Sequence, residues 1–302
     1  MTRRFRLTAA ALAVVGMLSL AGCGNNDPLN SDAQAGTSEA IVVGSQDYYS
    51  NEIVAEIYAQ SLESAGYTVD RQYRIGQREV YLPEIEAGKI DLFPEYTGNL
   101  LQYWKPDTTA RLSDDVYAEL VEATPDGLKV LDQAPATDQD SYVVTREFAE
   151  KWNLSSIEDL AKVTDPVILG GSSELETRPY GPKGLQETYA VPVSFTPIEG
   201  EGGPLTIKAL LENSIQLADI STASPQIKAN DLVTLDDPKG LFLASNLVPL
   251  ASDKLDDQVI ALVNKIDALM TPNELLEMNV RSTTEQKPAS AIAADWIKEK
   301  NL

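Results

Sequence analysis

Short apolar runs alternate with amphipathic segments from residue 41 onward. Residues 41–44 form an apolar, β-prone run that is typical of a buried strand. Residues 51–65 carry apolar side chains on one face and glutamates on the other, which predicts a helix. A strand over 68–73, a helix over 79–87 and a strand over 90–93 follow. Strands and helices that alternate at this spacing favour an α/β lobe with a largely parallel sheet.

A second cycle of the same kind begins near Ser141. Residues 85–92 and residues 211–220 both run from a helix end through a turn into a strand with an aspartate. This similarity between the two segments favours two similar α/β lobes that face each other. In such lobes the candidate ligand positions lie beyond the carboxyl ends of the strands. The elements predicted after Ser141 are strands at 142–145, 167–170 and 215–220, helices at 146–152 and 204–213, and a helical tail over 253–302.

The first 22 residues are typical of a secretory signal peptide. Three arginines within the first six residues precede an apolar stretch, residues 7–20, which is too short for a comfortable membrane span. The stretch ends in Leu20-Ala21-Gly22-Cys23, which matches the bacterial lipobox, and Cys23 is the only cysteine in the chain. We therefore expect lipidation at Cys23; the alternative is an ordinary signal peptide with a chance cysteine.

The segment after the predicted cleavage site is small and polar. Residues 23–39 have almost nothing to bury, which predicts a flexible tether between the lipid anchor and the folded part. Two acyl chains hold a protein at a membrane stably. The expected location is therefore the extracytoplasmic face of the cell membrane, with the membrane contacted through the lipid.

Composition excludes several classes of function. The chain has no histidine, and it has no cysteine after Cys23, so Ser-His-Asp sites, Cys-His sites and His-ligated zinc are excluded. Loss of the signal peptide removes three arginines and takes the formal net charge from −22 to −25. Such a surface repels nucleic acid. We expect no catalytic residues, no metal, no cofactor and no nucleic-acid partner; the acidity itself is explained most simply by solubility.

Several segments together resemble one known family. The chain from Ile41 to its end is similar to the glycine betaine/carnitine/choline-binding proteins of osmoprotectant ABC importers. The segment richest in matches runs Glu86-Ala87-Gly88-Lys89-Ile90-Asp91-Leu92-Phe93-Pro94-Glu95-Tyr96-Thr97-Gly98. The other matching segments are residues 41–45, 56–60, 138–140, 153–160, 176–179, 184–185, 231–233 and 236–240.

The resemblance implies a type II periplasmic-binding-protein fold with two lobes, each a mostly parallel sheet flanked by helices. It implies a division into a first lobe, residues 40–139 plus 245–302, and a second lobe, residues 140–244. It also implies a small solute bound in the cleft, a membrane permease and its ATPase as partners, and a monomeric protein.

The ligand site departs from the family pattern. Members of the family usually hold a quaternary ammonium group among several tyrosines, because aromatic faces attract a desolvated cation. Tyr96 matches one of these tyrosines, whereas Asp140, Ser221 and Ser245 stand where relatives often have aromatic residues. Hydroxyls and a carboxylate in place of rings predict a site that forms more hydrogen bonds, with a ligand changed or broadened from glycine betaine or choline.

Several of the candidate residues have an alternative role. Tyr96 can instead pack in a core between the lobes, Asn51 can cap a helix, and Asp140 can bond to backbone at the lobe crossing. Glu176 and Arg178 either bind a ligand carboxylate or form a structural salt bridge, which we favour. The full set of candidate ligand-binding residues is Tyr48, Tyr49, Asn51, Tyr96, Thr97, Asp140, Arg178, Ser221, Ser245 and Asn246.

Two other functions compete with that of a solute receptor. An extracellular carboxylate-dependent hydrolase needs two carboxylates across the cleft, and Glu95 with Asp140 is the pair available. A sensory lipoprotein without a transport role is distinguished only by the absence of a neighbouring permease gene. The leading interpretation is the receptor of an importer.

Overall fold

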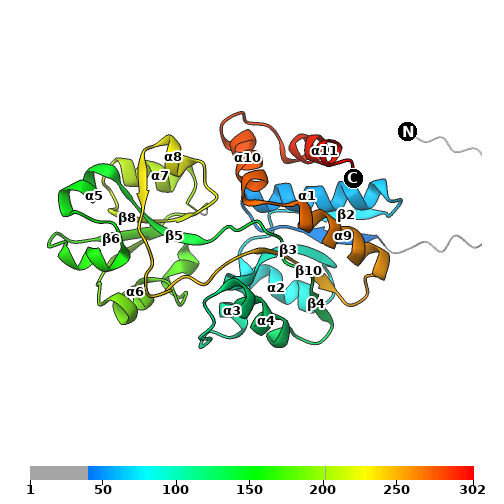
Figure 1. Ribbon diagram of the computed structural model, residues 1–302, viewed down its shortest axis with the longest axis horizontal. Coiled ribbons are helices and arrows are strands. Elements are labelled where there is room, and N and C mark those ends of the chain that lie inside the picture. The colour runs from blue at the N-terminus through cyan, green and yellow to red at the C-terminus, as the bar shows by residue number, and fades with distance from the viewer. Residues whose placement is uncertain (1–39, 201) are drawn as a thin grey trace, which may run out of the picture. The chain divides into compact units, whose positions relative to one another are not determined.

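The computed structural model describes residues 40–200 and 202–302 of the 302-residue chain. The predicted signal peptide, Cys23 and the tether over residues 23–39 lie outside the described residues. Two five-stranded sheets, each covered by helices on both faces, form the two lobes seen in Figure 1. In the described part of the chain, no helix is both long and apolar enough to cross a membrane.

The first sheet combines strands from both ends of the folded chain. β1 pairs in parallel with β2 and β3, and β10 runs antiparallel between β3 and β4. The sheet is therefore mixed, with β10 as the single reversed strand. Its order is β2 (Val69–Gln72), β1 (Ile41–Gly44), β3 (Leu92–Tyr96), β10 (Leu247–Ser252) and β4 (Leu128–Val130).

Helices cover both faces of the first sheet with separate apolar cores. On one face α1 packs against the three C-terminal helices around Tyr58 and Trp296, both of which are buried. On the other face the core centres on Tyr81 stacked against Phe93. The first group is α1 (Tyr49–Ser64), α9 (Asp257–Leu269), α10 (Pro272–Thr283) and α11 (Ala289–Lys300), and the second is α2 (Arg78–Glu86), α3 (Thr97–Trp104) and α4 (Ser113–Ala123).

The second sheet repeats the pattern of the first. β6 pairs in parallel with β7 and β8, and β5 runs antiparallel between β8 and β9. Its order is β7 (Ser194–Pro197), β6 (Ile168–Gly171), β8 (Leu217–Ser221), β5 (Asp140–Thr145) and β9 (Leu232–Thr234). The helical elements around it are α5 (Arg146–Trp152), η1 (Ile157–Lys162), η2 (Ser173–Glu176), α6 (Pro182–Tyr189), α7 (Pro204–Leu211) and α8 (Gln226–Ala229).

Two antiparallel segments connect the lobes. Residues 131–139 lead from β4 to β5, and residues 235–246 lead from β9 back to β10. Asp138 donates its backbone N–H to the carbonyl of Ser245 at 3.1 Å, and Thr137 forms a bridge with Asn246. Figure 1 shows both segments passing between the sheets. The crossing is therefore a short two-stranded ribbon, which is the kind of element that absorbs a hinge motion.

The predicted fold class is confirmed. Two α/β lobes are present, and each sheet is mostly parallel with one reversed strand. The reversed strand in each sheet, β10 or β5, directly follows a crossing segment, so it enters its sheet from the other lobe. The residue boundaries of the two lobes stay a prediction.

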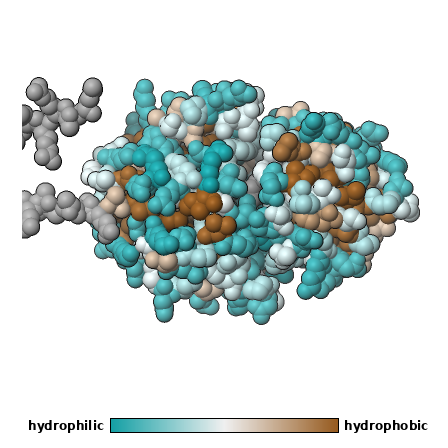
Figure 2. Space-filling view, turned by 180° about the vertical axis from the view of Figure 1, so that it is seen from behind, coloured by the Kyte–Doolittle hydropathy of each residue, from teal (hydrophilic) through white to brown (hydrophobic). Residues whose placement is uncertain are grey.

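Hydrophilic residues cover most of the face shown in Figure 2, and apolar residues appear there in separate patches on both lobes. Large apolar side chains that are strongly exposed include Leu112, which is 71% exposed, and Leu205, which is 65% exposed. They lie at the starts of α4 and α7. Singly exposed apolar side chains of this kind are ordinary on protein surfaces.

Candidate functional site

A cavity of about 610 Å³ lies where the carboxyl ends of β1, β3 and β8 approach the start of β5. The turn before α1, the start of α7 and the last turn of α10 complete its wall. Its side chains are mostly polar. The lining residues are Gln46, Asp47, Tyr48, Tyr49, Ser50, Arg74, Arg78, Tyr96, Asn99, Asp138, Asp140, Gly200, Gly202, Gly203, Pro204, Ser221, Ser224, Gln226, Ser282 and Thr283.

Two carboxylates from the crossing segment and β5 face this cavity. Asp138 accepts a hydrogen bond from the Ser221 hydroxyl and a second from the backbone N–H of Ala223 at 3.1 Å, both through Oδ1. Asp140 accepts a hydrogen bond from the Asn99 amide at 2.6 Å through Oδ2. Among the described residues neither carboxylate has an arginine or lysine within ion-pair distance. Both therefore carry negative charge into the cavity without a cationic partner.

The electrostatic environment of Asp138 is unusual for an aspartate. Burial raises the pKa of its carboxyl to about 6, and the nearby charge of Asp140 acts in the same direction. Hydrogen bonds from Ser221 and Ala223 oppose the shift. A carboxylate with a raised pKa in a cavity gains most from a cationic ligand, because the ligand's charge replaces the lost hydration.

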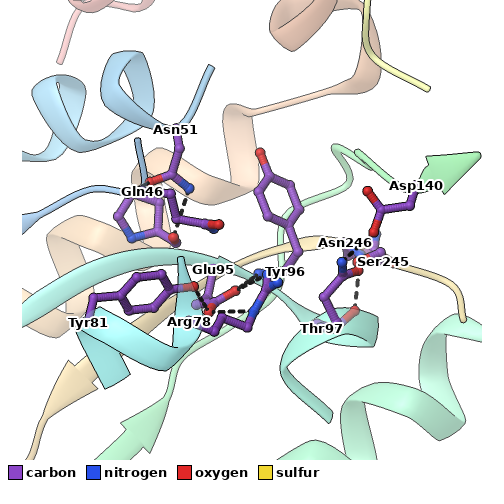
Figure 3. A network of polar contacts seen from close by, with 12 residues as sticks. Gln46, Asn51, Arg78, Tyr81, Glu95, Tyr96, Thr97, Asp140, Ser245 and Asn246 are labelled. Atoms are coloured by element: carbon purple, nitrogen blue, oxygen red, sulfur yellow. Dashed lines mark hydrogen bonds and ion pairs between the residues drawn. The ribbon is translucent and has the colours of Figure 1, made fainter. Parts of the chain in front are cut away.

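Three tyrosines contribute aromatic surface. Tyr48 and Tyr49 lie at the start of α1, and Tyr96 is the last residue of β3. Figure 3 shows the Tyr96 ring standing apart from the polar cluster around Glu95, with its hydroxyl directed away from that cluster. Burial is the main reason why the pKa values of Tyr49 and Tyr96 are raised, with the charge of Asp138 adding to it. The rings are therefore neutral and available to a cation.

One buried amide group of the lining has no hydrogen-bond partner among the described residues. It is Nε2 of Gln46, a residue that is 2% exposed. The buried hydroxyl of Tyr96 instead interacts with those of Tyr48 and Ser50. Buried polar groups are nearly always hydrogen-bonded, so a ligand acceptor or a water completes the bonding of Gln46.

A buried ion pair holds the backbone of Tyr96 in place. Arg78 contacts Glu95 through two hydrogen bonds, at 3.0 Å and 2.9 Å. The Tyr81 hydroxyl donates to the same carboxylate, and the backbone N–H of Tyr96 donates to it at 2.8 Å. Figure 3 shows this cluster next to the backbone of Tyr96, with the ring projecting away from it. The arrangement fixes the end of β3 and hence the direction of the Tyr96 side chain.

Both arginines of the lining are neutralised by glutamates. Arg78 pairs with Glu95, and Arg74 pairs with Glu52 on α1. The charges left uncompensated among the described lining residues are those of aspartates. The cavity therefore favours a positively charged ligand.

The structure brings half of the predicted site residues to the cavity. Tyr48, Tyr49, Tyr96, Asp140 and Ser221 line it. The other five, which are Asn51, Thr97, Arg178, Ser245 and Asn246, lie outside its lining.

Asn51 holds the first turn in place. Its side chain accepts the N–H of Gln46 and donates to the carbonyl of Pro94, both at 2.9 Å. It is fully buried and does not cap α1, whose cap position is Tyr48. The residue therefore ties the β1–α1 turn to β3.

Thr97, Ser245 and Asn246 hold the crossing segment against α3. The Thr97 hydroxyl accepts the backbone N–H of Asn246 at 3.0 Å. Ser245 donates to Asn99, which in turn donates to Asp140. Ser245 therefore acts on the cavity through Asn99, and none of the three residues lines it.

Arg178 forms an ion pair between the lobes. Its guanidinium lies 3.2 Å from the carboxylate of Glu79 on α2. Arg178 is 8% exposed. Of the two roles considered for this residue, the structure displays the salt bridge.

Several lining residues were not among the ten candidates, although Gln46, Ser50 and Asn99 lie in the turns after strands where a ligand was expected. Gln46 and Ser50 flank the predicted tyrosines in the first turn, and Asp138 precedes Asp140 by two residues. Asn99 follows Tyr96 and Thr97 in the matching segment. A signal was present for each, namely its position beside a predicted site residue, but the direction of a side chain in a turn depends on non-local contacts.

The geometry offers no support for the hydrolase alternative. Glu95 is fully buried, and both of its oxygens are held by Arg78, Tyr81 and the backbone of Tyr96. Within residues 40–200 and 202–302 no group of three or more acidic, cysteine or histidine side chains is placed to hold a metal ion.

Comparisons with known proteins agree with this geometry. A family described as the substrate binding domain of ABC-type glycine betaine transport systems matches residues 39–299. The glycine betaine-binding protein YehZ of Escherichia coli strain K12 is 24% identical over 275 residues, which span 86% of this chain and 90% of that protein.

A longer protein and a solved structure are also similar to this chain. The ergothioneine transport permease/ergothioneine binding protein EgtU of Helicobacter pylori strain G27 is 23% identical over 269 residues, or 87% of this chain and 48% of that protein. A crystal structure described as a glycine betaine/carnitine/choline ABC transporter has a TM-score of 0.69 at 18% identity and covers 86% of this chain and 98% of its own. At that identity the likeness shows the fold.

Proposed function

The chain belongs to the family of substrate-binding domains of ABC-type glycine betaine transport systems, and we propose that it captures a small cationic solute of the ammonium class for an ABC importer. Proteins of this family bind small solutes outside the cytoplasm and work with the permease and ATPase of the importer. The family consists of solute-binding proteins and is not a class of enzymes. We propose that this chain, likewise, catalyses no reaction.

The observation that carries the proposed ligand class is the uncompensated negative charge of the cavity. Asp138 and Asp140 face it without cationic partners among the described residues, whereas Arg74 and Arg78 are paired with glutamates. The rings of Tyr48, Tyr49 and Tyr96 offer aromatic faces to a cation.

The last turn of α10 adds to this field. Ser282 and Thr283 lie in that turn and line the cavity, so the negative end of the helix dipole lies next to the same space. We infer that the positive charge of the solute is the feature the cavity selects.

The names of the relatives suggest ligands to test. Glycine betaine, carnitine and ergothioneine each appear in the name of one of them. We propose that glycine betaine and choline themselves are not the best ligands, since Asp140 and Ser221 occupy positions where the family usually has aromatic residues. We also propose a monomer anchored through Cys23 to the outer face of the membrane, with lobes divided at residues 139/140 and 244/245.

Isothermal titration calorimetry on the purified protein tests the proposal. It compares the affinity for each cation with that for its isostere, a neutral molecule of the same shape in which carbon replaces the charged nitrogen. Choline is paired with 3,3-dimethyl-1-butanol, and N,N-dimethylethanolamine is paired with 3-methyl-1-butanol. We expect at least one cation to bind about thirtyfold more tightly than its isostere, because a desolvated cation among aromatic rings gains about 2 kcal/mol. Equal binding of cations and isosteres would contradict the proposed ligand class.

The affinity for a cation is expected to fall as the pH is lowered through about 6. Burial raises the pKa of Asp138 to about 6 in the free protein. Below that pH the carboxyl binds a proton and loses the charge that attracts the ligand, so proton and cation compete. Affinity is therefore full above about pH 7 and falls by up to about tenfold per pH unit below the pKa.

The groups that face Asp138 do not mask this dependence. Asp140 is the other carboxylate beside it, and Tyr49 and Tyr96 stay neutral because burial raises their pKa values. Titrations of wild type and Asp138→Asn between pH 5 and pH 8 check the prediction. The wild-type Kd should rise at low pH and that of the variant should change much less; parallel profiles would exclude Asp138 as the titrating group.

A further inference from the structure

We propose that the cationic head of the ligand carries at least one N–H group, that Asp140 and Asp138 accept hydrogen bonds from it, and that fully alkylated ammonium ions bind more weakly. This inference rests on the proposed function, since it concerns the same cavity and requires a cationic solute. It narrows the solute class from ammonium compounds in general to protonated amines and amidinium-like cations.

Asp140 presents an oxygen that the protein leaves unused. Its Oδ2 accepts the Asn99 amide at 2.6 Å, and its Oδ1 accepts no hydrogen bond from the described residues. Asn99 is itself fixed by Ser245 and Tyr180, at 3.1 Å each, so the carboxylate has a supported orientation. Figure 3 shows Asp140 across from the Tyr96 ring. An ionised carboxylate accepts several hydrogen bonds, and this one has capacity directed to the ligand space.

Asp138 provides a second acceptor of the same kind. Ser221 and the N–H of Ala223 both bond to Oδ1, which leaves Oδ2 without a protein donor in the described part of the chain. Asp138 is 8% exposed, so water is a poor substitute for a ligand donor at this depth. Two partly used carboxylates, close enough to influence each other's ionisation, form a convergent pair of acceptors.

The free carboxylate oxygens discriminate between ammonium heads. A trimethylated head presents only methyl groups to Asp138 and Asp140, so their unused oxygens would be left unsatisfied and shut off from water. A head with N–H groups instead donates hydrogen bonds to these two carboxylates.

Discrimination at such a site is expected to be large. A pocket built to hydrogen-bond a substrate N–H or O–H rejects an analogue that lacks the group, because the polar atoms of the pocket are left unpaired. Replacement of the last N–H by a methyl group also keeps the carboxylates farther from the charge. We expect this replacement to weaken binding by about 10- to 100-fold.

Two methylation series test the inference on the wild-type protein. One runs glycine, sarcosine, N,N-dimethylglycine and glycine betaine, and the other runs ethanolamine, N-methylethanolamine, N,N-dimethylethanolamine and choline. Within each series the charge of the head and the rest of the molecule stay constant while N–H groups are replaced by methyls. Calorimetric Kd values should rise by about 10- to 100-fold at the final methylation in at least one series. A fully methylated member that binds most tightly in both series would overturn the inference.

One variant tests the role of Asp140, because it removes the charge and one acceptor oxygen of this side chain together. Asp140→Asn keeps the shape of the side chain, and it should shrink the ratio between the dimethyl and trimethyl members to less than about threefold. Asp165→Asn makes the same change of charge on an exposed residue of the second sheet's lobe and should leave the ratio at its wild-type value. An unchanged ratio in Asp140→Asn would remove Asp140 from the proposal.

The outcomes for the inference and for the proposed function can be told apart. If cations bind better than their neutral isosteres but the quaternary members are tightest, only the inference fails. If cations and isosteres bind equally, the proposed ligand class fails and the inference fails with it. Thermal melts of both variants confirm that a changed ratio comes from folded protein.

Discussion

Arg78→Met is expected to lower the free energy of unfolding by about 3–5 kcal/mol, the largest effect we anticipate for a single substitution. Arg78 is 5% exposed and its partner Glu95 is fully buried. Removal of the guanidinium leaves a buried carboxylate whose remaining donors are the Tyr81 hydroxyl and the N–H of Tyr96. Those two hydrogen bonds do not compensate a full charge in an apolar core.

Urea denaturation of wild type and variant measures this loss. Arg74→Met is the matched control, because Arg74 lines the same cavity but its side chain is 58% exposed and its ion pair with Glu52 lies at the surface. We expect a change below about 1 kcal/mol for that control. The double variant Arg78→Met, Glu95→Gln removes both charges and should recover part of the loss. A single-variant effect no larger than that of the control would show that Glu95 is solvated or protonated instead.

Tyr96→Leu is expected to weaken the binding of a cationic ligand by about thirtyfold. The substitution keeps apolar bulk at the end of β3 but removes the aromatic face, and a desolvated cation over such a face gains about 2 kcal/mol. Tyr96 is 3% exposed and lines the cavity, so its ring is shielded from bulk water. Calorimetry with the tightest-binding cation of the methylation series gives the Kd values.

Tyr96→Phe serves as the control for this prediction. It keeps the ring and removes only the hydroxyl, which interacts with the hydroxyls of Tyr48 and Ser50. Its affinity should stay within about fivefold of wild type. If leucine and phenylalanine variants lose the same amount, the hydroxyl and not the aromatic face holds the ligand. If neither loses affinity, Tyr96 is a packing residue.

Local patterns in the sequence predicted the central strands of each lobe and several helices, but not the strands β4, β7, β9 and β10. The reason for the success is physical. Helix and strand periodicities depend on which face of each element is buried, and one element at a time can be examined for that. The similarity between residues 85–92 and 211–220 is an example. These segments join α2 to β3 and α7 to β8, and β3 and β8 occupy equivalent places in the two sheets.

The sequence pattern could not show that β10 and β5 run antiparallel to their neighbours. A buried strand has the same pattern in a parallel and an antiparallel neighbourhood when both faces are covered by helices. All six residues of β10 are buried. Its reversal follows from the crossing segment that delivers it from the second lobe, which is a feature of the whole chain path.

The location of the site was predictable from the sequence, but the residues that line it were less so. The rule that ligands lie beyond the carboxyl ends of strands pointed to the turns that hold Tyr48 and Tyr96. It did not separate Asp140, which faces the cavity, from Thr97 and Asn246, which bond to each other across 149 residues of sequence. Likewise, the raised pKa of Asp138 comes from burial beneath segments far away in the chain.

The return of β10 to the first sheet has a consequence for the order in which the chain can complete its parts. A growing polypeptide that ends at residue 234 already holds every strand of the second sheet, from β5 to β9. The same polypeptide lacks β10, so β3 and β4 have no neighbour between them and their edges stay open. The half of the molecule that begins first is thus finished last, and it depends on the final quarter of the chain to close its sheet.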